Sequence, residues 1–79
     1  MAKINNMKNF ISYLYKKRDL TNNSLKKFVY GDILYVLLYC FSTKNELKIY
    51  INNLISISYK AKSNVYKEVF RDLEKIYEK

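Results

Sequence analysis

Residues 33–46 read ILYVLLYCFSTKNE, which joins the most apolar part of the chain to a signal that begins a new helix. The apolar run Ile33–Phe41 has nine residues, whereas a helix that spans a membrane needs about 20. Thr43 and Glu46 then have the spacing of a capping box, in which the Thr43 side chain accepts a hydrogen bond from the Glu46 amide and the Glu46 carboxylate accepts one from the Thr43 amide. The stretch therefore predicts the end of one helix and the start of the next, with no membrane span.

On both sides of this boundary the apolar periodicity predicts four helices, over about residues 2–18, 24–41, 43–61 and 64–78. Residues 19–23 favour a turn, and Asn23 or Ser24 can cap the second helix. Ser63 or Asn64 is expected to cap the fourth. Because all three connections are short, neighbouring helices must run antiparallel. The expected fold is all-α: an antiparallel, up-down-up-down four-helix bundle that forms a single domain over residues 1–79.

Each predicted helix has a stripe of apolar side chains at three- and four-residue steps, and these stripes are the expected core. They are Ile4, Met7, Ile11 and Leu14 in the first helix; Leu25, Phe28, Val29, Val36 and Cys40 in the second; Leu47, Ile51, Leu54, Ile55 and Ser58 in the third; and Val65, Val69, Leu73 and Ile76 in the fourth. The second helix is apolar almost all the way round, with Leu34, Leu38 and Phe41 predicted on the side opposite its stripe.

One carboxylate lies on the apolar face of the second helix. Burying the charge of Asp32 without a partner would cost several kcal/mol. We therefore expect Asp32 to pair with a lysine, an arginine or a tyrosine hydroxyl as a structural residue, and contact with a ligand is the alternative. Thr43 and Glu46 are the other residues with an expected structural role.

The residue types present argue against catalysis and against a bound metal. Histidine is absent, and Cys40 is the only cysteine, so the usual general base and the usual zinc ligands are missing. Cys40 lies in an apolar run, where packing in the core is the expected role. Gly31 stands alone, so there is no glycine-rich loop to hold a phosphate. We expect a binding protein that is not an enzyme and that has no cofactor, no metal and no small-molecule substrate.

The chain is basic, and its fourth predicted helix separates charged from apolar side chains most clearly. Fifteen Lys and Arg against seven Asp and Glu give a net charge of +8, which favours an anionic partner such as nucleic acid, a phospholipid surface or an acidic protein face. Aromatic and arginine side chains are frequent hot spots in interfaces. The expected partner-binding residues, in this helix and the turn before it, are Lys60, Lys62, Asn64, Tyr66, Lys67, Phe70, Arg71, Lys75 and Tyr77.

Nucleic-acid binding is the alternative function, since the chain has nine tyrosines and four phenylalanines that could stack on bases beside its lysines. Most of these rings fall on or beside the predicted core stripes, and no helix-turn-helix glycine turn is visible. A small basic helical nucleic-acid-binding or regulatory protein therefore ranks second. An unrelated helical protein-interaction module ranks third.

Several short motifs resemble one family in both residues and order. They are Tyr30-Gly31-Asp32-Ile33, Val36-Leu37, Ser42-Thr43-Lys44-Asn45 and Ile51-Asn52-Asn53-Leu54. With these motifs the chain resembles the immunity proteins of pediocin-like bacteriocins, of the leucocin and enterocin A type. The resemblance runs from Tyr30 to Leu54, and the four-helix pattern extends it weakly over the remainder.

The resemblance implies a cytoplasmic four-helix bundle that protects a bacterial cell from a pore-forming peptide. Members of the family are thought to act from the cytoplasmic side on the membrane permease of the mannose phosphotransferase system once the bacteriocin has engaged it. Their specificity is held to reside in the C-terminal half. Peripheral contact with an anionic membrane at the inner face of the cell membrane would suit the basic surface.

Overall fold

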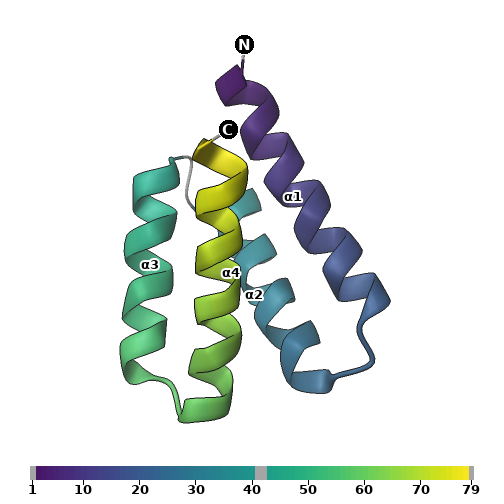
Figure 1. Ribbon diagram of the computed structural model, residues 1–79, viewed down its shortest axis with the longest axis vertical. Coiled ribbons are helices and arrows are strands. Elements are labelled where there is room, and N and C mark those ends of the chain that lie inside the picture. The colour runs from purple at the N-terminus through teal and green to yellow at the C-terminus, as the bar shows by residue number, and fades with distance from the viewer. Residues whose placement is uncertain (1, 41–42, 79) are drawn as a thin grey trace.

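The computed structural model of the chain describes residues 2–40 and 43–78, with side chains described from Met7 to Cys40 and from Thr43 to Ile76. Its four helices are α1 (Ala2–Leu20), α2 (Ser24–Tyr39), α3 (Lys44–Ile57) and α4 (Lys60–Glu78). They run alternately up and down, and α4 packs against α1, α2 and α3 (Figure 1). The predicted all-α, up-down-up-down four-helix bundle is confirmed.

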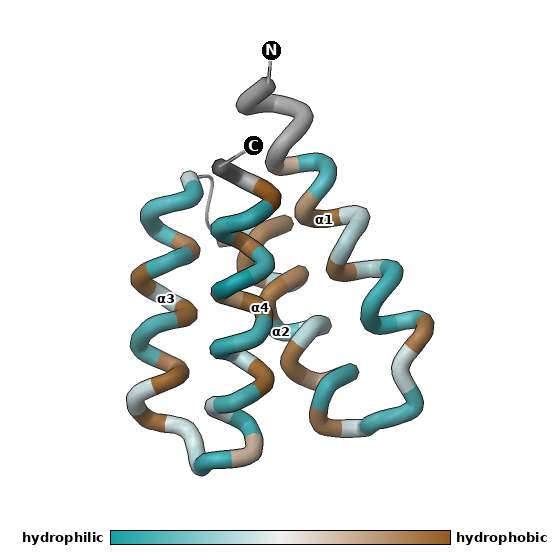
Figure 2. Tube along the Cα trace, viewed as in Figure 1, coloured by the Kyte–Doolittle hydropathy of each residue, from teal (hydrophilic) through white to brown (hydrophobic). Residues whose placement is uncertain are grey.

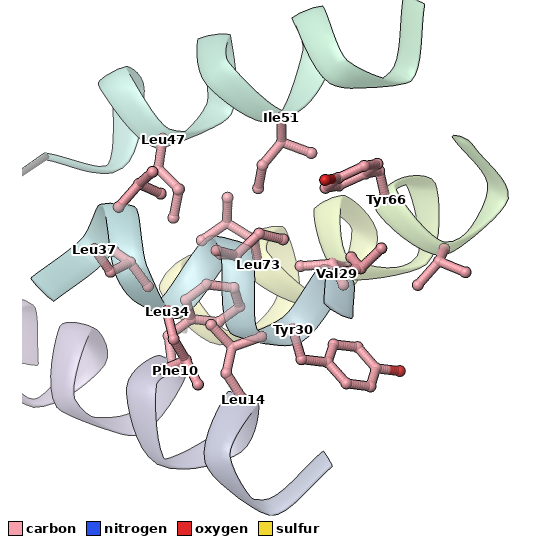
Figure 3. Close-up of a cluster of buried hydrophobic side chains, with 14 residues drawn as sticks. Phe10, Leu14, Val29, Tyr30, Leu34, Leu37, Leu47, Ile51, Tyr66 and Leu73 are labelled. Atoms are coloured by element: carbon pink, nitrogen blue, oxygen red, sulfur yellow. The ribbon is translucent and has the colours of Figure 1, made fainter. Parts of the chain in front are cut away.

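All four helices contribute to one core (Figure 3). Its buried hydrophobic residues are Phe10, Leu14, Val29, Tyr30, Ile33, Leu34, Val36, Leu37, Leu47, Ile51, Val65, Tyr66, Val69 and Leu73. The predicted stripes of α3 and α4 are confirmed, because Leu54, Ile55 and Ile76 pack against this cluster as partly buried side chains. In α1, Leu14 is buried and Met7 and Ile11 are partly buried, as predicted. Phe10, which the α1 stripe omitted, is fully buried.

The predicted face of α2 is wrong in part. Phe28 is 58% exposed and Cys40 is exposed, whereas Leu34 is buried. The physical reason is that α2 carries more apolar residues than one face can bury, and hydrophobic colour recurs along it in Figure 2, so its sequence does not single out one face. Packing against both α1 and α4 selects the face that is buried. The predictions for Ile4, Phe41 and Tyr77 concern side chains outside the described ones.

The predicted boundary between the third and fourth helices is also wrong. Helix α3 ends at Ile57 and α4 begins at Lys60, so Ser63 and Asn64 lie inside α4 and do not cap it. The buried hydroxyl of Ser63 donates a hydrogen bond of 2.9 Å to the backbone oxygen of Ile55. The last carbonyls of a helix lack partners within the helix. Ser63 therefore caps the end of α3 from within α4, and this holds the two helices together across a short turn.

Two predicted caps at helix starts are confirmed. The Asn23 side chain accepts a hydrogen bond of 3.0 Å from the Lys26 amide at the start of α2. Thr43 accepts one of 3.2 Å from the Glu46 amide at the start of α3, which is one half of the predicted capping box. Among the described residues, no helix is both long enough and apolar enough to cross a membrane.

Candidate interaction surface

Asp32 accepts hydrogen bonds from two tyrosine hydroxyls at the meeting point of three helices. The hydroxyl of Tyr66, on α4, lies 2.9 Å from one carboxylate oxygen of Asp32, on α2. The hydroxyl of Tyr50, on α3, lies 3.1 and 3.3 Å from the two oxygens. The expectation that Asp32 pairs with a tyrosine hydroxyl is confirmed, and the cluster connects α2, α3 and α4. The sequence predicted that Tyr66 binds a partner at the surface. This prediction is wrong, because Tyr66 is fully buried.

A partly buried tyrosine, Tyr13, joins α1 to α4. The hydroxyl of Tyr13 donates a hydrogen bond to the Asp72 carboxylate. Burial and this carboxylate raise the pKa of Tyr13 well above its usual value. Burial, followed by the charge of Asp32 and the hydrogen bond to it, raises the pKa of Tyr50 to about 12. Burial and the hydrogen bond to Asp32 likewise raise the pKa of Tyr66. In each case the neutral tyrosine is the form that the fold stabilises.

This arrangement predicts a loss of stability in alkali. A tyrosine whose pKa rises from 10.0 in the unfolded chain to about 12 in the folded protein, as for Tyr50, contributes stability that is fully present below pH 10. That contribution is lost as the pH rises through 12. We expect chemical denaturation to show a constant free energy of unfolding from pH 8 to 9.5, roughly, followed by a steep fall. Replacing Tyr13 or Tyr50 by phenylalanine should make that fall shallower, and an unchanged slope would contradict the assigned pairs.

The outer side of α4 presents a continuous polar stripe, here called the α4 stripe, made of Lys60, Asn64, Lys67, Arg71 and Lys75. All five side chains are exposed. Their spacing of three or four residues places them on one side of the helix. The opposite side of α4 is buried through Val65, Val69 and Leu73. The structure therefore brings together five of the nine residues predicted for partner binding.

Two other residues of the predicted set lie beside the stripe and not within it. The Lys62 ammonium sits 4.6 Å from the centre of the Phe28 ring and 5.9 Å from that of Tyr66, so it faces α2. Phe70 is partly buried beneath the Lys48 ammonium, 5.6 Å from its ring centre. Lys48 in turn forms an ion pair with Glu74 at 2.7 Å. These contacts cover part of the Phe70 ring and reduce what it can offer to a partner.

Exposed apolar side chains are the surface residues that the sequence pattern missed. The large ones are Tyr15, Leu20, Phe28, Tyr35, Leu38, Tyr39, Ile49, Ile57 and Tyr59. Leu38 is the one among them that was expected away from the stripe of α2. For Phe28, Tyr35 and Tyr39, which lie on α2, the signal was the excess of apolar residues in that helix over what one buried face can hold. Cys40 belongs to the same exposed set and carries a free thiol.

Within the described residues, no group of three or more His, Cys, Asp and Glu side chains is placed to hold a metal ion. No protein-family model, curated protein or solved structure matches the chain.

Proposed function

We propose that this protein is an immunity protein of the pediocin-like bacteriocin type, which protects a bacterial cell by binding the bacteriocin-engaged mannose permease from the cytoplasmic side. The α4 stripe is the observation that carries the proposal. It presents four cations to the solvent from a helix whose other side is fixed in the core. A partner can bind these side chains without any change in the fold.

Two further observations support the proposal. The motifs between Tyr30 and Leu54 resemble those of this family in both residues and order. The resemblance implies a four-helix bundle with specificity in its C-terminal half. The chain forms such a bundle, and the α4 stripe lies in that half.

The proposal predicts protection that depends on the α4 stripe. Expression in a bacteriocin-sensitive strain that carries the mannose permease should raise its tolerance to one or a few pediocin-like peptides and leave its sensitivity to unrelated pore-forming peptides unchanged. The double variant Lys67→Glu, Arg71→Glu should abolish this protection, because it reverses the charge at the centre of the stripe. Its helicity and melting temperature should stay close to wild type, since both side chains are exposed.

A matched control variant is available on α1. Lys8, Asn9 and Ser12 are exposed, and changing all three to glutamate lowers the net charge from +8 to +4, as the stripe variant does. This control should remain protective. Equal loss of protection in both variants would show that overall charge, and not the stripe, is required. Absence of protection by the wild type, together with tight salt-sensitive binding to duplex DNA, would favour the nucleic-acid alternative.

A further inference from the structure

The bundle has one end at which two of its turns lie, because α1 joins α2 and α3 joins α4 at the same end (Figure 1). This end, here called the turn end, consists of residues 16–28 and 57–62. It contains the last residues of α1 and α3 and the first residues of α2 and α4. A cation–π contact connects its two segments, since the Lys62 ammonium lies 4.6 Å from the centre of the Phe28 ring. The two segments therefore form neighbouring parts of one surface.

Most of the protein's net charge is concentrated at the turn end. Seven of the fifteen Lys and Arg residues lie in these two segments, against only one carboxylate, that of Asp19. The turn end thus carries +6 of the total charge of +8, and the remaining residues together carry +2. The cations are Lys16, Lys17, Arg18, Lys26, Lys27, Lys60 and Lys62. Such an uneven distribution produces a strong positive potential at one end of the molecule.

Large apolar side chains protrude among these cations. Ile57 is 78% exposed and Leu20 is 76% exposed, and these are the highest values among the large apolar residues described. Tyr59 and Phe28 are 65% and 58% exposed. Leu20 ends α1 two residues after Arg18, Tyr59 directly precedes Lys60, and Ile57 lies three residues before it. The turn end therefore combines exposed aliphatic and aromatic groups with a surrounding group of cations.

We propose that the turn end is a docking surface for an anionic lipid bilayer. Its lysines and Arg18 would meet acidic lipid headgroups, and Leu20 and Ile57 would enter the boundary between the headgroups and the acyl chains. Stable binding at a bilayer surface needs both an apolar and an electrostatic contribution. The turn end supplies both. This inference does not depend on the proposed function, because it requires neither a permease nor a bacteriocin.

The apolar residues favour lipid over nucleic acid as the partner. Nucleic acid would use the same cations and could stack on Tyr59 or Phe28. It offers no comparable environment for the aliphatic side chains of Leu20 and Ile57, which lack a ring for stacking and a polar group for hydrogen bonding. At a bilayer, by contrast, aliphatic side chains, tyrosines and lysines each have a favourable depth.

Vesicle flotation with the purified full-length chain tests the proposal. Vesicles of phosphatidylglycerol and phosphatidylcholine in equal parts are compared with vesicles of phosphatidylcholine alone. The wild type should bind only the anionic vesicles. The variant Lys27→Glu, Lys60→Glu should bind them about thirtyfold more weakly or worse. The variant Lys67→Glu, Arg71→Glu has the same net charge of +4 and should keep most of the binding. Equal weakening in both variants would overturn the assignment to the turn end.

A second variant tests the apolar contribution at constant charge. Leu20→Ser, Ile57→Ser leaves all the cations in place and should still weaken binding to the anionic vesicles several-fold, with an unchanged circular dichroism spectrum. Unchanged vesicle binding in this variant would show that the aliphatic groups do not insert. Failure of the wild type to bind anionic vesicles would overturn the proposal. Tight binding to duplex DNA or single-stranded RNA that is lost in Lys27→Glu, Lys60→Glu would assign the turn end to nucleic acid instead.

Discussion

Replacing Leu73 by alanine should lower the free energy of unfolding by about 2 to 5 kcal/mol. Leu73 is fully buried in the core, on the helix that packs against all three others (Figure 3). The substitution removes buried apolar surface and leaves a cavity that the surrounding helices fill only in part. A domain of this size has little stability to spare. Urea denaturation followed by circular dichroism measures the change.

Leu54→Ala is the matched control for this prediction. Leu54 is a leucine on α3 that is only partly buried at the edge of the same core, so its truncation should cost less. Equal or greater cost for Leu54→Ala would mean that the buried face of α4 has been assigned incorrectly. An altered dependence of unfolding on urea concentration would instead indicate a change in the compactness of the folded or unfolded state.

Replacing Asp32 by alanine should lower the free energy of unfolding by about 2 to 4 kcal/mol. The reason is that two tyrosine hydroxyls lose their acceptor, and that of the fully buried Tyr66 cannot turn to the solvent. The loss exceeds that of an ordinary surface carboxylate because the hydrogen bonds involve a charged group. The pKa of Tyr50 should also fall from about 12 towards its usual value. Denaturation and ultraviolet titration of tyrosinate measure the two effects.

A double-mutant cycle isolates the contact that carries this effect. Tyr66→Phe alone should be less costly than Asp32→Ala, because Asp32 keeps the hydrogen bond from Tyr50. Combining the two substitutions should cost less than the sum of the single changes, because each removes part of the same interaction. Strict additivity would show that the two groups do not interact in solution.

The sequence predicts the elements whose polar and apolar residues are clearly separated. In α4, Lys67, Arg71 and Lys75 were expected in solvent and Val69 and Leu73 in the core, and each is so placed. The cap at Asn23 could be predicted because its side chain has one local task. A buried carboxylate must have partners, so the pairing of Asp32 was predicted as well.

The remaining features depend on tertiary contacts that local sequence does not encode. Helix α2 offers more apolar surface than one face can bury, and its neighbours determine that Leu34 is buried while Phe28 and Cys40 are exposed. Ser63 resembles a residue that caps its own helix, but its hydroxyl binds a carbonyl of the preceding helix. Tyr66 was expected among the partner-binding residues and is instead buried, with its hydroxyl donating to Asp32, a partner 34 residues away.

The hydrogen bond from Ser63 to Ile55 also bears on the order in which the chain can fold. It spans only eight residues, and the turn that it closes contains two. Bringing such close segments together costs little chain entropy, so the hairpin of α3 and α4 can form early. The link from Asp32 to Tyr66 spans 34 residues and requires α2 to have docked. We therefore expect the hairpin of α3 and α4 to form before the tyrosine cluster.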